Sequence, residues 1–182
     1  MTGPAEVAAF LGGPGSFSEE ARERFVPDAT PLPCHNFAEV RQAVIDGRAA
    51  VGLLPVRNSA IGTIAENADL ADDPRVAIER QEALPIELHL WTREGIGRKE
   101  LKAVSSHPAA LAQCSTYLGL LRLPTIWAES TGEAAAEVAR SADPIAAIAG
   151  ERAGRATGLI MLDSSVQDGI GNETIFAIFR RA

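Results

Sequence analysis

The chain has 182 residues and a net charge of −7, and it is 46% hydrophobic with only 5% aromatic residues. This length allows one ordinary domain or two small lobes, whose core must be built mainly from Ala, Val, Leu and Ile. The sequence has no apolar run long enough to span a membrane, no basic cluster typical of nucleic-acid binding and no N-terminal signal pattern. Cys34 and Cys114 lack metal-ligand spacing. We therefore expect reduced thiols in a cytoplasmic protein, with no metal ion, no cofactor and no nucleic-acid or membrane partner.

The hydrophobic pattern predicts an α/β fold. A strand at residues 7–11 is followed by a glycine-rich turn and by a helix from Ser18 to Phe25, with Ser16 or Ser18 as its N-cap. The other predicted elements, in chain order, are a helix at 37–44 that Gly47 ends, a strand at 50–55, a helix at 61–70, a strand at 83–91, a strand near 104, a helix at 108–121, a strand at 125–128, a helix at 130–140, a strand at 145–148, a helix at 151–157, and strands at 159–162 and 174–179. No linker is rich enough in Pro, Gly or Ser to separate independent domains, so we expect a single domain over residues 1–182.

Two segments in the first half of the chain could bind an anion or a polar ligand. Residues 10–18 read FLGGPGSFS, and backbone N–H groups near Gly15, Ser16 and Ser18 could approach an anion at the start of a helix. Taken by itself, this segment favours the alternative, a tight turn that needs glycine for geometry alone. Residues 51–59 read VGLLPVRNS and place Asn58 and Ser59 at the carboxyl end of a strand, where open α/β sheets bind ligands. The alternative is a polar turn in which Ser59 caps the next helix.

Two further segments lie in the second half. Residues 104–114 read VSSHPAALAQC; Ser106 is predicted to cap a helix that Pro108 opens, and Gln113 lies about two turns further on. His107 could be a general base, although a histidine beside a helix cap is more often structural. Residues 172–176 read NETIF and place Thr174 in a strand after a Gly/Asp turn. By itself this last segment is also compatible with an ordinary strand that carries a threonine on its polar face.

Taken in this order, the four segments resemble the motifs of the prephenate dehydratase family. They are similar to aromatic-Leu-Gly-Pro-x-Gly-Thr-Phe-Ser, Gly-Val-x-Pro-Ile-Glu-Asn-Ser, Ser-His-Pro-Gln-Ala-Leu-x-Gln-Cys and Asn-x-Thr-Arg-Phe, and they extend over nearly the whole chain. Two positions depart from the motifs, because Arg57 occupies the place of a glutamate and Ile175 that of an arginine.

The resemblance implies a fold like that of type II periplasmic binding proteins, with two α/β lobes around a cleft. Lobe one is then expected at about residues 1–83 with the C-terminal strand 174–182, and lobe two at about 93–168. Strands 84–91 and 174–179 would cross between the lobes as a hinge. The family often carries a C-terminal regulatory domain that binds an amino acid. Since the chain stops soon after the fourth motif, we expect neither that domain nor regulation by phenylalanine.

The resemblance also implies a reaction, in which prephenate loses CO2 and hydroxide and its ring becomes aromatic. Thr174 would then donate to the departing hydroxyl, and Asn58, Ser106 and Gln113 would share the catalytic work as neutral donors. Arg57 could replace the missing motif arginine from across the cleft as a partner for a carboxylate, or it could be an exposed, solvated side chain. The substrate-binding residues implied by the resemblance are Ser59, Arg57, Gly15, Ser16, Ser18, His107 and Phe176.

Three functions stay open at this point. The first is a prephenate dehydratase that forms phenylpyruvate. The second is a prephenate decarboxylase of the same family, which keeps the ring hydroxyl and gives a non-aromatic dihydro-4-hydroxyphenylpyruvate; Ile175 favours it, because that branch also has an aliphatic residue in place of the arginine. The third is a binding module without chemistry. In each case we expect a small-molecule partner, prephenate, and a homodimer.

Overall fold

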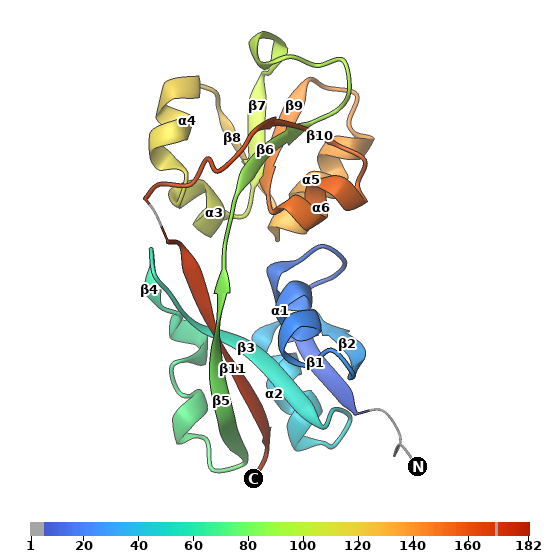
Figure 1. Ribbon diagram of the computed structural model, residues 1–182, viewed down its shortest axis with the longest axis vertical. Helices are drawn as coiled ribbons and strands as arrows, with labels where there is room; N and C mark the ends of the chain where they lie inside the picture. Colours follow the sequence, from blue (N-terminus) through green and yellow to red (C-terminus); the bar gives the residue numbers. More distant parts are fainter. Residues whose placement is uncertain (1–5, 170) are drawn as a thin grey trace. The chain divides into compact units, whose positions relative to one another are not determined.

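The protein has a mixed α/β architecture with two sheets, seen in a computed structural model that describes residues 6–169 and 171–182 (Figure 1). The chain divides into two compact units. Unit 1 contains the residues up to Gly13, Phe17–Pro85 and Glu173–Ala182, and unit 2 contains Pro14–Ser16 and Ile86–Asn172. The C-terminal strand therefore belongs to the same unit as the first strand, because it completes that unit's sheet.

Unit 1 is built on a sheet with the strand order β2-β1-β3-β11-β5, to which β4 adds beside β3. β1 runs parallel to β2 and β3, whereas β11 runs antiparallel to both of its neighbours. The elements of this unit are β1 (Val7–Leu11), α1 (Phe17–Phe25), β2 (Thr30–Cys34), α2 (Phe37–Ile45), β3 (Val51–Asn58), β4 (Gly62–Thr63), the short 3-10 helices η1 (Ala65–Asn67) and η2 (Leu70–Asp72), β5 (Val76–Pro85) and β11 (Glu173–Arg181).

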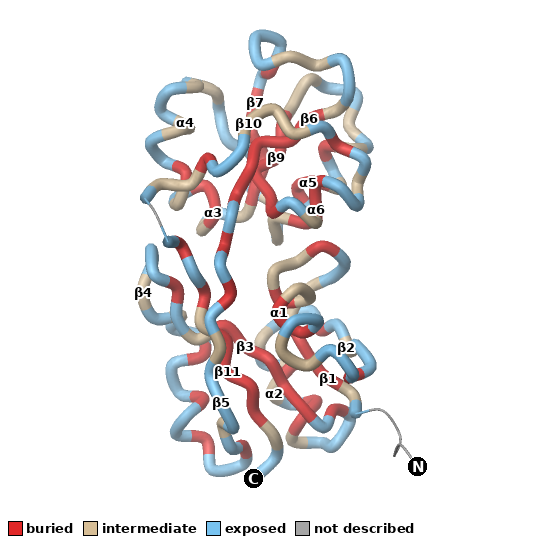
Figure 2. Tube along the Cα trace, in the orientation of Figure 1, coloured by how far each residue is buried: buried red, intermediate tan, exposed pale blue. Residues whose placement is uncertain are grey.

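The core of unit 1 joins α2 to the central strands. Val40 and Val44 of α2 are fully buried against Leu54 and Phe179, and Figure 2 shows the buried course of β3 through the sheet. Gly52 is required here, since a Cβ atom at this position would lie 2.3 Å from the ring of Phe179.

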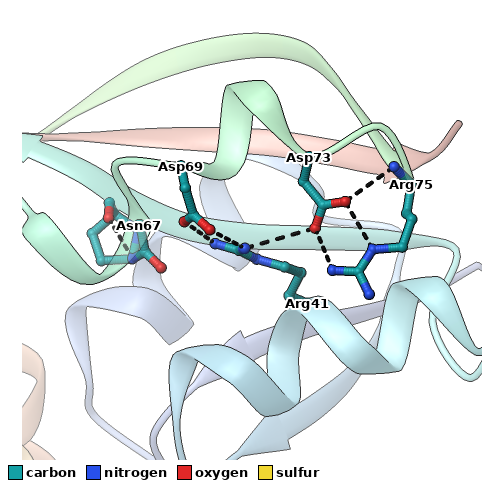
Figure 3. Close-up of polar contacts among 6 residues, drawn as sticks. Arg41, Asn67, Asp69, Asp73 and Arg75 are labelled. Atoms are coloured by element: carbon teal, nitrogen blue, oxygen red, sulfur yellow. Dashed lines mark hydrogen bonds and ion pairs between the residues drawn. The ribbon is translucent and has the colours of Figure 1, made fainter.

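A chain of ion pairs ties α2 to the start of β5. The Arg41 guanidinium donates two hydrogen bonds to Asp69, at 2.8 and 2.9 Å, and lies 3.7 Å from Asp73, which in turn accepts two hydrogen bonds from the side chain of Arg75 (Figure 3). These arginine contacts lower the pKa of Asp73 to about 2. The network holds the 3-10 turn η2, which lies between Asp69 and Asp73, against the helix.

Unit 2 is built on a second sheet, with the strand order β10-β6-β9-β7-β8. Its apolar core contains Trp91, Ala135 and Val138, and Gly154 lets α6 lie directly on Trp91, since a Cβ atom there would be 2.1 Å from the indole. The elements are β6 (His89–Thr92), the 3-10 helix η3 (Arg98–Glu100), β7 (Ala103–Ser106), α3 (Pro108–Ala112), α4 (Ser115–Leu121), β8 (Thr125–Trp127), α5 (Thr131–Arg140), β9 (Ile145–Ala149), α6 (Glu151–Ala156) and β10 (Ile160–Asp163).

Most of the predicted elements are confirmed, but three of them are wrong. The helix predicted at 61–70 is absent, because Gly62 adopts a φ of 83° and pairs as β4 with the end of β3. The strand predicted at 83–91 is interrupted between Pro85 and His89, where the N–H of Ile86 donates to Asn172 O at 2.8 Å instead of continuing a ladder. The helix predicted at 108–121 breaks into α3 and α4, where the carbonyl of Gln113 accepts from the N–H of Asp168 at 2.5 Å.

The hydrophobic pattern of the sequence did not predict β2 or the first half of β5. β2 contains Pro31 and Pro33, which argue against a strand, but β2 lies at the edge of its sheet, where proline is tolerated. The first half of β5 is largely exposed, so it lacks the continuous apolar run by which a buried strand is recognised.

Candidate active site

Unit 1 brings Thr174 and Asn58 together, 116 positions apart in sequence. They are direct partners in the antiparallel pair of β11 and β3, and the Asn58 amide nitrogen donates to Thr174 Oγ1 at 2.9 Å. Both side chains are buried, and Thr174 is 9% exposed. The contact therefore depends on the register of the two strands.

The orientation of the Asn58 amide is fixed by the backbone. Its oxygen accepts from the N–H groups of Ala60, at 2.9 Å, and Ile61, at 3.2 Å, so its nitrogen must face Thr174. Since that nitrogen is a donor, Thr174 Oγ1 is the acceptor of this bond, and its own hydrogen is directed elsewhere. The Thr174 hydroxyl donates to no residue that the structure describes. A threonine held in this way keeps its own O–H hydrogen available as a donor.

Ser59 holds the same strand from the same side as Asn58. Its N–H donates to the carbonyl of Glu173 at 2.9 Å, and its hydroxyl accepts from the N–H of Glu173 at 2.9 Å. Together with the Asn58 amide, which also donates to the Glu173 carbonyl at 3.1 Å, these bonds hold the residue just before Thr174. Ser59 thus positions the strand, and the helix cap considered for it is not formed.

Arg57 lies next to Ile175 rather than opposite it across a cleft. The two residues are direct partners on β3 and β11, in the same sheet. The expectation that Arg57 acts from the far side of a cleft is therefore wrong. Because successive side chains of a strand point to opposite faces, Arg57 and Ile175 begin on the face opposite to Asn58 and Thr174. The Arg57 side chain is exposed and makes no hydrogen bond or ion pair with any described residue.

The glycine turn after β1 needs its glycines for geometry. Gly15 is buried with a φ of 82°, and a Cβ atom there would lie 3.0 Å from Ala153 Cα. Ser16 is half-buried after it, whereas Ser18 is buried within α1 of unit 1. The tight-turn explanation accounts for Gly15, and it leaves the proposed anion contact of Ser16 as a prediction.

His107, and not Ser106 as expected, is the N-cap of α3. Ser106 is fully buried and donates its hydroxyl hydrogen to the carbonyl of Ile148 at 2.6 Å, so it does not cap α3 and this hydrogen is not offered to a substrate. The N-cap is His107, whose Nδ1 accepts from the N–H of Ala109 at 3.2 Å. Burial lowers the pKa of His107, which favours the neutral ring that this acceptor role requires.

Gln113 is held by a residue of the fourth motif. Its side-chain oxygen accepts from the Asn172 amide nitrogen at 2.9 Å, while the Asn172 carbonyl accepts from the N–H of Ile86. The Gln113 nitrogen donates to no described residue. Gln113 therefore offers an amide donor whose direction Asn172 sets. Asn172 is the positioning residue that sequence reasoning left out of the site, although its place in the motif was the signal for it.

Other candidate groups are less suited to chemistry. Phe176 is buried in the core of unit 1, so its side chain supports β11 instead of presenting a surface to a substrate. Burial raises the pKa of the Cys114 thiol to about 12, which keeps it protonated and unreactive. Among the residues described, no group of three or more His, Cys, Asp or Glu side chains could hold a metal ion. A cavity of ≈ 490 Å³ beside the Arg41 network is lined by none of the four motifs.

Comparison with known proteins settles the family. The sequence profile described as "Prephenate dehydratase" matches residues 8–182. The chain belongs to the prephenate dehydratase family. It is 36% identical over 174 residues to "Arogenate dehydratase/prephenate dehydratase 1, chloroplastic" of Arabidopsis thaliana, a match that covers 95% of this chain and 44% of that protein. The chain thus spans less than half the length of this curated relative.

Solved structures of prephenate dehydratases have the same fold. The enzyme from Arthrobacter aurescens, solved in complex with L-Phe, superposes with a TM-score of 0.87 at 27% identity and covers 97% of this chain and 60% of its own. The enzyme from Staphylococcus aureus superposes with a TM-score of 0.82 at 27% identity, covering 96% of this chain and 66% of its own. A periplasmic substrate-binding protein of a Coxiella burnetii ABC transporter aligns at 10% identity with a TM-score of 0.51, over 94% of this chain and 84% of its own, which confirms the predicted fold class.

The register of β3 and β11 places both departures from the prephenate dehydratase motifs at one cross-strand pair. A glutamate at position 57 and an arginine at position 175, the residues of the motifs, would be direct partners with Cβ atoms roughly 4.5–5.5 Å apart. Opposite charges at such positions stabilise a sheet. In this chain the pair is Arg57 and Ile175, which carries a single positive charge.

In the part of the chain that the structure describes, no helix is long and apolar enough to cross a membrane.

Proposed function

We propose that the chain acts as a lyase on prephenate, removing CO2 and the ring hydroxyl to give phenylpyruvate. The observation that carries the proposal is the Thr174 hydroxyl, whose oxygen accepts from Asn58 and whose own hydrogen is donated to no residue that the structure describes. Membership of the prephenate dehydratase family and the similarity to solved prephenate dehydratases support the choice of substrate.

The reaction needs a donor at the leaving oxygen more than it needs a strong acid. As CO2 leaves, the electron pair of the breaking C–C bond enters the ring, and the ring expels the hydroxyl as aromaticity is gained. Negative charge develops on the departing oxygen, where a preorganised O–H donor stabilises it. Thr174 is that donor in our proposal. Asn58 acts through Thr174, because its nitrogen occupies the threonine oxygen and thereby sets the direction of the O–H bond.

Gln113 is the second donor that we propose for the substrate. Its nitrogen is available while Asn172 holds its oxygen. Ser106 is not part of the proposed donor set, because it gives its hydrogen to Ile148. The donors in this proposal are all neutral, so the carboxylates of prephenate need a cation.

Arg57 is our proposed cation for one substrate carboxylate. It is exposed, has no partner among the described residues and adjoins the position of the missing motif arginine. An arginine side chain carries its charge several bonds from the backbone, so its guanidinium can leave the face on which the stem begins. In this role Arg57 contributes to binding and not to the bond-breaking step.

A second function, non-aromatising decarboxylation of prephenate, is favoured by one observation. Ile175 replaces the motif arginine, and it is half-buried beside Arg57. In that reaction the electron pair left behind by CO2 is taken up by a proton from solvent at a ring carbon, and the ring hydroxyl stays. The retained Thr174–Asn58 pair is the reason that we place dehydration first. Binding without turnover is the third outcome that the experiment must separate.

One experiment separates these functions. The purified chain is incubated with prephenate and, since several relatives are named arogenate dehydratases, with arogenate in a parallel reaction. Ultraviolet and mass spectra then distinguish the aromatic product, which has lost CO2 and water, from a product that has lost only CO2. Phenylpyruvate from prephenate is the expected result; unchanged prephenate with measurable binding would overturn the proposal in favour of a binding module. Cytoplasmic location and a homodimer stay predictions.

A further inference from the structure

An exposed apolar surface lies at one edge of the sheet in unit 2. Among the described residues, five large hydrophobic side chains are exposed, and three of them, Leu120, Ile126 and Trp127, belong to α4 and β8. Trp127 is 77% exposed and Ile126 is 42% exposed. α4 has no buried residue at all. A tryptophan and an isoleucine in succession on an edge strand are unusual in a monomer, because such edges recruit other chains.

The backbone of β8 is also unpaired on its outer side. β8 is the last strand in the order β10-β6-β9-β7-β8 and pairs only with β7, in parallel register. The bonds to β7 use the carbonyl of Pro124 and the N–H of Ala128, the residues at either end. Because backbone groups of alternate residues face opposite edges of a strand, Thr125 and Trp127 direct their N–H and C=O groups outward.

The charges that flank β8 are complementary about its centre. Arg122 precedes the strand and Glu129 follows it, both are exposed, and neither makes an ion pair with a described residue. A second copy related by a two-fold axis perpendicular to the sheet runs antiparallel, which brings Arg122 of one copy to the end where the other carries Glu129. A parallel neighbour would instead set like charges beside each other. The strand is thus complementary to its own antiparallel copy.

We propose that β8 is a self-association surface, at which two copies of this chain pair their β8 strands antiparallel about Ile126. In this register Thr125 of each copy lies opposite Trp127 of the other, and the two residues exchange both backbone hydrogen bonds. Each threonine also meets a tryptophan on the same face, a cross-strand pair that favours sheets. The two five-stranded sheets become one continuous sheet. The inference does not depend on the proposed function, since none of its residues is in the proposed site.

The experiment is sedimentation velocity of the 182-residue chain over a dilution series, with circular dichroism as the control for folding. The parent is expected to be dimeric at high concentration, and Ile126→Lys is expected to be a folded monomer. The matched control is Ile160→Lys, which places the same charge at an isoleucine that is 48% exposed on β10, the opposite edge of the same sheet. This variant should stay dimeric.

The charge pair gives a test that misfolding cannot imitate. Arg122→Glu and Glu129→Arg should each weaken the dimer by about tenfold or more, whereas the double variant should return to the parent's dimer affinity, because the two ends again carry opposite charges. A parent that stays monomeric throughout the series overturns the proposal. So does a dimer that Ile160→Lys disrupts and Ile126→Lys does not, or a double variant weaker than either single variant.

Discussion

The Thr174 hydroxyl can be tested by removing it without changing the shape of the side chain. Thr174→Val keeps the branched outline and suits a strand, so the variant should fold. The Asn58 nitrogen retains one acceptor, the Glu173 carbonyl at 3.1 Å, and is not left unsatisfied. We therefore expect a loss of only about 0.5–1.5 kcal/mol in the free energy of unfolding. For a chain of this size, that corresponds to a fall of a few degrees in the melting temperature.

The effect on catalysis should be much larger than the effect on stability. If the hydroxyl donates to the departing oxygen, its loss should lower kcat by about 10²–10³-fold, the range found for a single preorganised donor. KM should change little, since the interaction strengthens as charge develops. The assay is the initial rate of phenylpyruvate formation followed by its ultraviolet absorbance. Thr174→Ser is the matched control, because it keeps the donor; it should retain turnover within about tenfold of the parent.

The direction of the hydroxyl is tested separately with Asn58→Asp. The new carboxylate can still accept from the N–H groups of Ala60 and Ile61, but it turns the donor to Thr174 into an acceptor. The threonine hydrogen should then be drawn to the carboxylate, and turnover should fall about as far as in Thr174→Val. A folded Thr174→Val variant that works within about tenfold of the parent would refute the reasoning and remove Thr174 from the mechanism.

Three further predictions concern binding and pH. Arg57→Ala should raise KM for prephenate by roughly ten- to a hundredfold with kcat little changed; an unchanged KM would show that Arg57 does not bind the substrate. The double variant Arg57→Glu with Ile175→Arg restores an opposite-charge cross-strand pair. In urea unfolding it should therefore be more stable than the sum of the two single changes predicts, by about 0.2–1 kcal/mol. Gln113→Glu keeps the acceptor for Asn172 but loses the donor, so it should melt near the parent temperature while kcat/KM falls at least tenfold, and parental kcat/KM would exclude Gln113 as a donor. Burial lowers the pKa of His89 below its ordinary 6.5, so the unfolded chain takes up its proton first as the pH falls, and the free energy of unfolding should decrease from about pH 6.5 downward. His89 Nδ1 accepts from the N–H of Ser165 at 3.0 Å, and the amide oxygen of His89→Gln can keep this bond. Urea titrations of His89→Gln should show a shallower decrease, and an identical decrease would show that other groups cause it.

The sequence by itself determined the family, the α/β class and the position of most elements. These features are encoded locally: strands appear as apolar runs, α5 appears through the N-cap Ser130 and its alanine-rich face, and α2 ends before Gly47. The motif residues Thr174, Asn58 and Gln113 were named from their order along the chain. Periodicity and capping act over a few residues, so they can be found without knowledge of the fold.

Only the tertiary structure decided what those residues do. The hydrogen-bond direction at Thr174 follows from the pairing of β11 with β3, and the same register makes Arg57 the neighbour of Ile175. The hydroxyl of Ser106 is committed to Ile148, and His107 takes over the helix cap, because β7 and β9 lie side by side in the second sheet. Whether a hydroxyl or an amide keeps a hydrogen for a substrate depends on hydrogen-bond partners far away in sequence. The local sequence pattern holds no information about those partners.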